Sequence, residues 1–282
     1  MKRLVSIQDI SCVGKCSLTV ALPIVSAAGV ETAVMPTAVL STHTAFKGFT
    51  FRDLTGDLRA IAEHWKREKI RFDAIYTGYL GSFEQIEIVL EFIRDFRTPE
   101  TLVFVDPAMG DNGQLYVGFD QAFAREMGRL CDQADVIVPN LTEAAAMLGI
   151  PYPGDDCPRA EQEAILRQLC ERGAGQALLT GAPEGQDRLG VLALDGRTGA
   201  FSSYYRERIP QNFHGTGDVF ASACAGALVR GATLPEAMKL AVDFTVASLH
   251  ATLANPDHNW YGVDFETALP ELIRGLDAAL KK

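Results

Sequence analysis

Several features that would assign the chain to other protein classes are missing from its 282 residues. No apolar run approaches the roughly 20 residues that a membrane-spanning helix requires. The opening MKRLVSIQDI is interrupted by Asp9 too soon for a signal peptide, and it predicts a first strand. Basic residues do not dominate, because the net charge is −10. We therefore expect no membrane and no nucleic-acid partner, while a small anionic ligand remains open.

The cysteines and histidines lack the spacings of common metal sites. The six cysteines are scattered, and Cys12 and Cys16 have no second close pair to complete a zinc site. The five histidines show no HExxH spacing. Reduced thiols are the simplest interpretation, which predicts a cytoplasmic protein.

Gly14-Lys15 stands where a Walker phosphate loop would have its Gly-Lys pair, but the rest of that loop is missing. The pattern G-x-x-x-x-G-K-[ST] would start with glycine and end with a hydroxyl, whereas the chain has Asp9 and Cys16 there. A carboxylate would repel phosphate, and a thiol is a poor Mg²⁺ ligand. We interpret Lys15 as a solvated surface charge.

Strands alternate with helices along most of the chain. Apolar runs predict strands at 4–10, 32–40, 72–78, 101–107, 135–140, 176–181, 188–195 and 199–209. Helical spacing predicts helices at 17–29, 54–69, 82–96, 122–134, 141–150, 159–173, 218–231 and 234–253. This alternation predicts an α/β fold whose central, mostly parallel sheet is flanked by helices on both faces, in three layers. No repeat, low-complexity segment or linker divides it, so we expect a single domain over 1–282.

Ligands of open parallel sheets bind beyond the carboxyl ends of the strands, so residues that follow strands deserve most weight. The stretch FHGTGDVFAS (213–222) places two glycines and an acid at the start of an alanine-rich helix. Glycines allow a ligand to approach the backbone, and a helix N-terminus favours an anion such as a phosphoryl group. Asp218 could then accept the proton of an attacking hydroxyl. A turn followed by an aspartate cap is the simpler alternative.

Carboxylates and amides follow other predicted strands. Asp106 ends a buried strand and Asp111 lies in the glycine-rich loop after it, a pair that suits Mg²⁺. Asn140 ends the next strand, with Glu143 one turn into a helix, and Thr180 ends another strand. Local turn and capping roles are open for each of these residues.

Taken together, GTGD, DPAMGD and PNLTE resemble the ribokinase-like superfamily of small-molecule kinases. Three further stretches, SIQDISCVGKCSL, STHTAF and TGYLGS, are similar to the pyridoxal kinase family, in order along almost the whole chain. The resemblance implies a ribokinase-like fold and transfer of phosphate from ATP, with Mg²⁺ and often a monovalent cation such as K⁺. The implied acceptor is the 5′-hydroxymethyl group of pyridoxal, pyridoxine or pyridoxamine, and the implied assembly is a homodimer.

The resemblance also implies roles for individual residues on the vitamin side. Ser11 looks like the hydroxyl that binds the pyridine ring, His43 and Thr44 look like the loop that contacts its other side, and Tyr79 looks like an aromatic wall. Ser11 as a helix N-cap, His43 as a loop-ordering residue and Tyr79 as core packing remain alternatives.

On the nucleotide side, Asp218 matches the family's catalytic base. The matching anion hole is Gly215, Thr216 and Gly217. The matching ATP and Mg²⁺ region comprises Asp106, Asp111, Tyr116, Asn140, Glu143 and Thr180, with Asp106, Asp111 and Glu143 nearest the metal. Ala108 departs from the family pattern, which has a larger residue there.

Two rival functions remain. A hydroxymethylpyrimidine kinase of the same superfamily usually carries GTGC, where this chain has GTGD and a less glycine-rich first turn. A non-catalytic protein that binds vitamers or nucleotides is the alternative from another class, and the retained acids argue against it.

Overall fold

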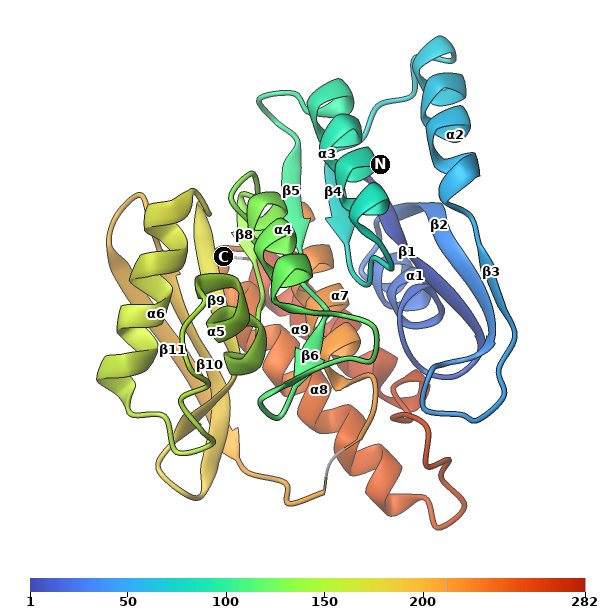
Figure 1. Cartoon of the computed structure of the whole chain (residues 1–282). Coiled ribbons are helices and arrows are strands. Elements are labelled where there is room, and N and C mark those ends of the chain that lie inside the picture. The colour runs from blue at the N-terminus through green and yellow to red at the C-terminus, as the bar shows by residue number, and fades with distance from the viewer. Residues whose placement is uncertain (212, 282) are drawn as a thin grey trace. The chain divides into compact units, whose positions relative to one another are not determined.

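The computed structural model describes residues 1–211 and 213–281, and its chain divides into two compact units (Figure 1). Unit 1 comprises Met1–Gly81, Thr98–Thr101 and Pro210–Lys282, and unit 2 comprises Ser82–Arg97 and Leu102–Ile209. The single domain expected over 1–282 includes residues 212 and 282, which lie outside the described residues. It stays a prediction.

The sheet of unit 1 has the strand order β4-β1-β2-β3. Its strands are β1 (Arg3–Val13), β2 (Glu31–Thr42), β3 (Phe51–Asp53) and β4 (Ala74–Thr77). β1 runs parallel to β2 and β4, while β3 is antiparallel to β2. β1 is buried from Leu4 to Asp9, as expected of a parallel strand with both faces covered. The pairing of β1 with β2 shifts register between Gln8 and Ile10, which marks a bulge opposite Asp9.

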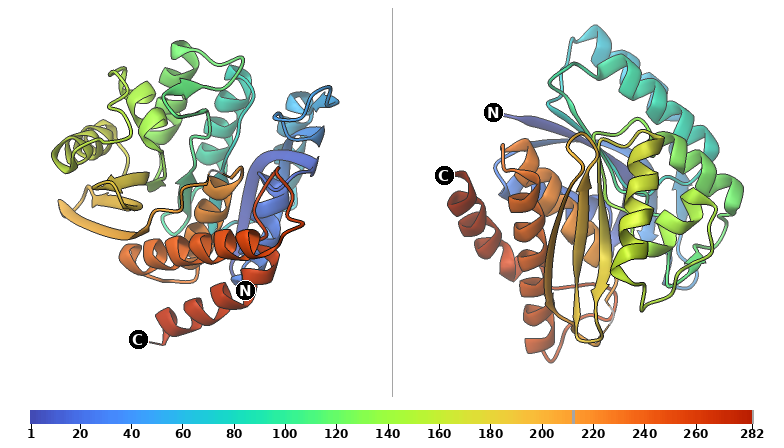
Figure 2. Two further views of the ribbon diagram at one scale, coloured as in Figure 1. Left: turned by 90° about the horizontal axis from the view of Figure 1, so that it is seen from below. Right: turned by 90° about the vertical axis from the view of Figure 1, so that its left-hand side faces the viewer.

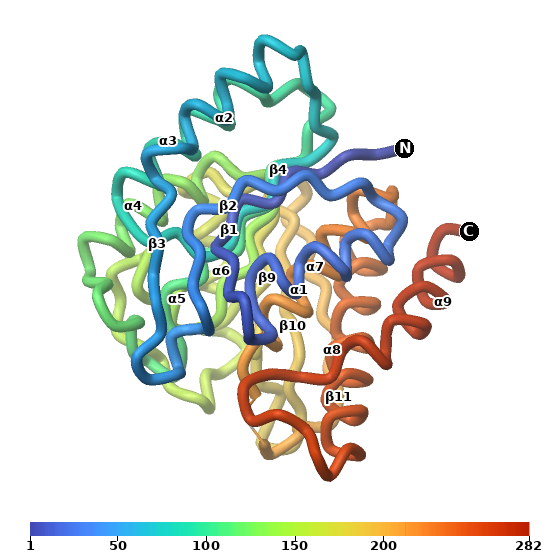
Figure 3. Tube along the Cα trace, turned by 90° about the vertical axis from the view of Figure 1, so that its right-hand side faces the viewer, coloured from blue at the N-terminus to red at the C-terminus, as the bar shows by residue number. Residues whose placement is uncertain are grey.

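Figure 3 shows the helices of unit 1, most of which pack against one another. They are α1 (Leu18–Ala27), α2 (Thr55–Arg67), α7 (Thr216–Val229), α8 (Leu234–Ala254), the 3₁₀ turn η1 (Glu266–Ala268) and α9 (Leu269–Leu280). α1 packs against β1, β2 and α7, and α8 packs against α7 and α9. Small residues allow the close approach of α7, because a Cβ on Gly226 would lie 2.9 Å from the Cβ of Ala28.

Unit 2 has the strand order β11-β10-β9-β8-β5. Its elements are α3 (Phe83–Phe96), β5 (Leu102–Val105), β6 (Gly110–Asp111), β7 (Gln114–Leu115), α4 (Gln121–Cys131), β8 (Val136–Ile137), α5 (Leu141–Leu148), α6 (Arg159–Arg172), β9 (Gln176–Glu184), β10 (Arg188–Asp195) and β11 (Ala200–Glu207). β5, β8 and β9 are parallel, and β10 is antiparallel to β9 and β11. α6 lies along β9 and β10 (Figure 2, right).

The α/β fold with a mostly parallel sheet and packed helices is confirmed. Each predicted strand and helix is present with shifted ends, and β3, β6, β7 and α9 were not predicted. α7 begins at Thr216, two residues before the predicted start, so Thr216 and Gly217 belong to the helix. Across the described residues, no helix combines the length and the apolar character needed to cross a membrane.

Candidate functional site

The N-terminus of α7 carries the strongest of the sequence motifs. Gly215 precedes the helix with φ 80°, and Thr216, Gly217 and Asp218 form its first turn. The first four N–H groups of an α-helix have no intrahelical acceptor, so this end can bind an anion. Gly217 is exposed, and a Cβ there would meet nothing within 4 Å. The residues of the predicted anion hole are therefore together, with open space beside them.

Asp218 is half-buried at this helix end, and its carboxyl is unusually basic. Burial raises the pKa of Asp218 to about 7, the N–H of Ser17 lowers it, and the negative charge of Asp9 raises it. A carboxyl that titrates near neutral pH is suited to accept a proton from an alcohol. The environment therefore fits the predicted base.

A second carboxyl, Asp9, lies on β1 and is only 4% exposed. The Ser11 hydroxyl donates a hydrogen bond to Asp9 Oδ2 at 3.1 Å. Burial raises the pKa of Asp9, while the hydroxyls of Ser17 and Ser11 lower it. Ser11 itself is 1% exposed and lies within β1, so the alternative that it caps a helix is wrong. Its role toward a ring stays a prediction.

Cys16 and Tyr79 lie near the two carboxyls. Burial, then Asp218, raises the pKa of the Cys16 thiol to about 12. Burial and the charge of Asp9 raise the pKa of the half-buried Tyr79. Both groups therefore stay neutral at neutral pH. Tyr79, predicted as an aromatic wall, is at least brought close to Asp9.

His43 is buried in an aromatic cluster rather than pointing freely from its loop. Its Nε2 lies 3.0 Å from the carbonyl of Tyr261, and its Nδ1 accepts the N–H of Ala45 at 3.2 Å. These partners fix the neutral tautomer that carries its proton on Nε2, and burial lowers the pKa of His43. The ring of Phe46 lies 5.0 Å from that of His43. His43 therefore orders its loop, whereas neighbouring Thr44 is exposed.

Lys15 is not the solvated surface charge that we predicted. Its side chain is only 16% exposed, and its Nζ pairs with Asp264 at 2.6 Å and with Glu266 at 2.9 Å. The Lys15 carbonyl is so close to Gly215 that a Cβ on that glycine would lie 1.9 Å from it. Lys15 thus ties the turn after β1 to the start of α7 and to the chain near η1. The sequence prediction failed because these partners are distant in sequence.

Asn140, Glu143 and Thr180 come together in unit 2. Asn140 Oδ1 accepts the N–H of Glu143 at 2.9 Å, and Glu143 Oε2 accepts the N–H of Asn140 at 2.9 Å. This reciprocal pair is the capping box of α5. Thr180 forms a β-bridge with Asn140, and its N–H donates to Pro139 at 2.9 Å. The capping alternative is therefore correct for Asn140 and Glu143, and their nucleotide role stays a prediction.

The same capping box holds the loop that carries Asp111. Glu143 Oε1 accepts the N–H of Met109 at 3.1 Å, and Asn140 Nδ2 donates to the carbonyl of Gly110 at 2.8 Å. The exposed Asp111 accepts hydrogen bonds from its neighbour Asn112. The loop continues to Tyr116, which is 44% exposed and donates its N–H to Met109 at 2.9 Å.

The donor chemistry of this region fits a divalent cation, although no ready-made cluster is present. Glu143 is 4% exposed and Asp106 is 8% exposed. Burial raises the pKa of Glu143. Three backbone N–H donors lower this pKa, and the charge of Asp111 raises it. A nearby cation would relieve the cost of this buried negative charge. In residues 1–211 and 213–281, no three metal-binding side chains converge on one point.

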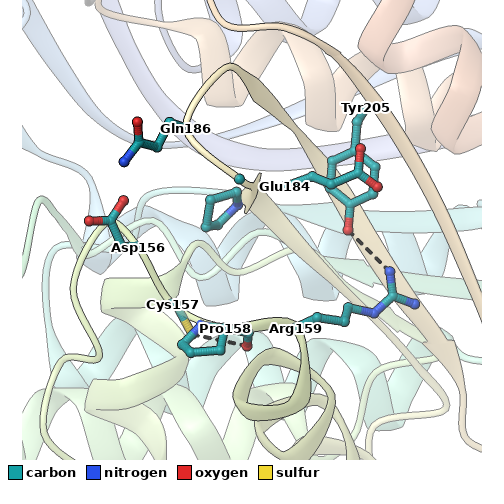
Figure 4. Close-up of a pocket in the computed structure, with 9 residues that line it drawn as sticks. Asp156, Cys157, Pro158, Arg159, Glu184, Gln186 and Tyr205 are labelled. Carbon is teal, nitrogen blue, oxygen red and sulfur yellow. Dashed lines mark hydrogen bonds between the residues drawn. The ribbon is translucent and has the colours of Figure 1, made fainter.

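A separate hollow of about 500 Å³ in unit 2 contains none of the predicted site residues. It is lined by residues 156–159 and 183–186 and by Tyr205. Figure 4 shows Arg159 pointing toward Tyr205, with Nη1 donating to the phenol oxygen at 3.3 Å. Two of its charged residues already have ion-pair partners, because Arg159 pairs with Glu163 and Glu184 pairs with Arg188. We assign it no role.

Sequence reasoning missed Asp9, Ser17 and Lys15 as parts of the site. A charged residue inside the predicted strand LVSIQDI was the available signal for Asp9. Ser17 adopts φ 50° and ψ −134°, a backbone conformation that a serine in the sequence does not predict.

Comparisons with known proteins show which proteins this chain is similar to. A family model described as phosphomethylpyrimidine kinase matches residues 25–261. A crystal structure from Bacteroides thetaiotaomicron, provisionally described as a phosphomethylpyrimidine kinase and crystallised with pyridoxal, has a TM-score of 0.91 and 40% identity, covering 96% of this chain and 95% of that one. Pyridoxal kinase from Lactobacillus plantarum has a TM-score of 0.88 and 34% identity, covering 97% of each chain. The pyridoxine/pyridoxal/pyridoxamine kinase of Bordetella avium is 29% identical over 260 residues, 88% of this chain and 84% of that protein.

The fold and these likenesses place the chain in the class of α/β small-molecule kinases. Within that class, the chain belongs to the phosphomethylpyrimidine kinase family, because the family model matches most of its length. The resemblance to pyridoxal kinases is confirmed by the proteins from L. plantarum and B. avium.

Proposed function

We propose that the protein transfers the γ-phosphoryl group of ATP to the 5′-hydroxymethyl group of pyridoxal, pyridoxine or pyridoxamine. One observation carries the proposal: a carboxyl with a pKa of about 7, Asp218, lies in the first turn of a helix whose N-terminus can hold a phosphoryl group. The similarity to kinases of the B6 vitamers supports the choice of acceptor.

In this proposal, Asp218 accepts the hydroxyl proton of the vitamer while the alcohol oxygen forms its bond to the γ-phosphorus. The bond between that phosphorus and the β–γ bridging oxygen breaks, and ADP leaves. The N–H groups of Thr216 and Gly217 stabilise the charge on the transferred group. Tyr79, Ser11, His43 and Thr44 contribute to the vitamer pocket in unit 1.

Unit 2 supplies the nucleotide side of the proposal. Asn140, Thr180 and Tyr116 bind ATP, together with the buried end of β5 at Asp106. Asp106, Asp111 and Glu143 hold Mg²⁺, mainly through water, since both oxygens of Glu143 already accept backbone N–H groups. When bound, Mg²⁺ neutralises phosphate charge. A monovalent cation such as K⁺ is a further proposed cofactor.

The test is a coupled assay of ADP release with each of the three vitamers and with hydroxymethylpyrimidine. We expect vitamer-dependent ADP release that requires Mg²⁺. ADP release that is absent, or the same without any vitamer, would exclude the function.

Hydroxymethylpyrimidine phosphorylation is the second candidate, favoured by the description of the matching family model. A higher kcat/KM for hydroxymethylpyrimidine than for every vitamer in the same assay would establish it. A protein that binds either ligand without catalysis would show saturable binding and no ADP.

We also propose a cytoplasmic homodimer. All six cysteines are free, as in a reducing compartment. The edge strand β3 exposes Phe51 by 53%, which suits an interface. Light scattering coupled to size exclusion would measure the oligomeric state, and a monomer at working concentration would contradict the dimer.

A further inference from the structure

The chain between α8 and η1, residues 255–264, has no assigned role although it lies against the proposed vitamer site. The Tyr261 carbonyl lies 3.0 Å from His43 Nε2, in the loop that follows β2. A Cβ on Gly262 would lie 2.3 Å from the Cβ of Lys15, in the turn that follows β1. The segment therefore contacts the chain just beyond the carboxyl ends of two parallel strands, where ligands of such sheets bind.

The same segment also contacts the chain that enters α7. The rings of Trp260 and His214 lie 6.5 Å apart, and those of His258 and Phe213 lie 5.9 Å apart. His214 directly precedes Gly215, which is the N-cap residue of α7 and the first residue of the proposed anion hole. The Trp260 ring thus lies beside the residue that leads into the proposed phosphoryl site.

Trp260 belongs to a group of rings in unit 1 that we call the aromatic cluster: His43, Phe46, His214, Trp260 and Tyr261. The Trp260 ring lies 4.6 Å from that of Phe46, 5.9 Å from that of Tyr261 and 6.0 Å from that of His43. His43 is buried, whereas Trp260 is 57% exposed. A large aromatic side chain that is packed on one side and open on the other can cover a ligand.

Hydrogen bonds fix the two ends of the segment, so Trp260 is held in position before a ligand binds. Asn255 Nδ2 donates to Asp264 Oδ2 at 2.9 Å, and the Asp264 N–H donates to Thr252 Oγ1 at 2.7 Å. Asp264 also pairs with Lys15 at 2.6 Å. A side chain that is held in this way loses less conformational freedom when it contacts a ligand.

We propose that Trp260 forms a further wall of the vitamer pocket, with its indole packed against the pyridine ring of the bound vitamer. This inference rests on the proposed function, because it takes the vitamer as the acceptor. The π-systems of the two rings favour an offset-stacked or edge-to-face contact. Trp260 contributes to the affinity for the vitamer and takes no part in proton transfer.

The kinetic test compares Trp260→Ala with Ile273→Ala, which truncates another exposed apolar side chain of unit 1, on α9. In Trp260→Ala the KM for pyridoxine should rise about tenfold while kcat and the KM for ATP stay unchanged, because only a contact with the vitamer is lost. Trp260→Phe, which keeps a ring, should restore most of the affinity, and Ile273→Ala should behave as the wild type. An unchanged KM for pyridoxine in folded Trp260→Ala would overturn the proposal.

A binding measurement on the intact side chain needs neither catalysis nor a folded Trp260 variant. The sequence contains two tryptophans, so protein labelled with 5-fluorotryptophan should give two ¹⁹F signals, which Trp65→Phe assigns. Trp65 lies on α2 with its ring 5.4 Å from that of Phe72, and it serves as the internal control. Saturating pyridoxine should shift the Trp260 signal and reduce its solvent isotope shift, because the bound ring covers the indole. The Trp65 signal should stay in place.

The outcomes separate this inference from the proposed function. Pyridoxine that saturates the protein in calorimetry but leaves the Trp260 signal unchanged would overturn the inference alone. A protein that shows the Trp260 shift and phosphorylates no vitamer would overturn the proposed activity alone. A protein that binds no vitamer would overturn both.

Discussion

Asp218 is half-buried at the start of α7, and its carboxyl exchanges a proton near neutral pH, well above its ordinary pKa of 3.8. Burial is the largest cause, and a neighbouring negative charge adds to it. The same environment that makes the carboxyl a good acceptor makes its ionised form costly to the folded state. Activity and stability should therefore respond in opposite directions when this residue is neutralised.

Asp218→Asn should retain the fold and lose activity by about 10²–10⁴-fold, because the amide cannot accept the substrate proton. Steady-state kinetics with pyridoxal and circular dichroism would measure the two effects. Asp57→Asn, which removes an equal charge from α2, should keep wild-type turnover. Near-wild-type turnover by Asp218→Asn would contradict the base role.

The stability of the wild type should fall as pH rises between about 4 and 7. In this range the folded state keeps a proton on Asp218, whose pKa is about 7, while the unfolded state has lost it from a group with its ordinary value of 3.8. The folded state binds more protons, so the free energy of unfolding decreases with pH. Asp218→Asn removes this term and should exceed the wild type by about 2 kcal/mol at pH 8. Urea unfolding at several pH values would test it, and a difference that does not grow with pH would disagree.

At the scale of elements, the turn after β1 and the start of α7 depend on each other through backbone contact. Gly215 combines φ 80° with a space of 1.9 Å between its absent Cβ and the Lys15 carbonyl. Neither partner can yield easily, because the contact involves main-chain atoms. The glycine is therefore needed for packing as well as for anion access.

Gly215→Ala should destabilise the protein by more than about 2 kcal/mol and reduce activity. Gly231→Ala is the matched control, since Gly231 has φ 97° but a Cβ there would meet nothing within 4 Å. It should cost only about 1 kcal/mol from backbone strain. Equal losses for the two variants in denaturant unfolding would show that the clash does not matter.

Lys15→Met should cost about 1–2 kcal/mol, because it leaves the mostly buried Asp264 without its ammonium partner. Lys239→Met provides the comparison, since Lys239 pairs with Asp243 along one exposed face of α8. Exposed pairs of this type contribute about 0.5 kcal/mol or less. Denaturant unfolding should rank the two variants in this order, and the reverse order would refute the bracing role of Lys15.

Sequence patterns predicted the elements better than they predicted the contacts between elements. Long amphipathic segments such as α3 and buried runs such as β5 have a clear period, whereas β3, β6 and β7 are too short to show one. GTGD and PNLTE were identified because their residues are adjacent in sequence. Asp9 and Lys15 were misjudged because their partners come from other elements, which no local pattern contains.

For the whole molecule, the two units should respond to different ligands. Pyridoxal should slow hydrogen exchange in unit 1 at residues 9–17, 43–46 and 214–218, and a non-hydrolysable ATP analogue should slow it in unit 2 at residues 106–116, 140–143 and 178–181. The reason is that bound ligand suppresses the local opening that exchange requires. Exchange measured by mass spectrometry would check this assignment. Protection of the unit 2 segments by pyridoxal alone would reverse the proposed roles.

The link between Lys15 and Asp264 spans 249 residues of sequence. A ribosome therefore releases the first strand and its turn long before the acids that hold Lys15 have been synthesised. Until then, neither Asp264 nor Glu266 is present to bind the Lys15 ammonium. Gly215, against which the Lys15 carbonyl rests, is also missing. The contact between this turn and the start of α7 can form only near the end of translation, so a nascent or prematurely terminated chain would contain its first strand and still be unable to assemble the proposed proton acceptor.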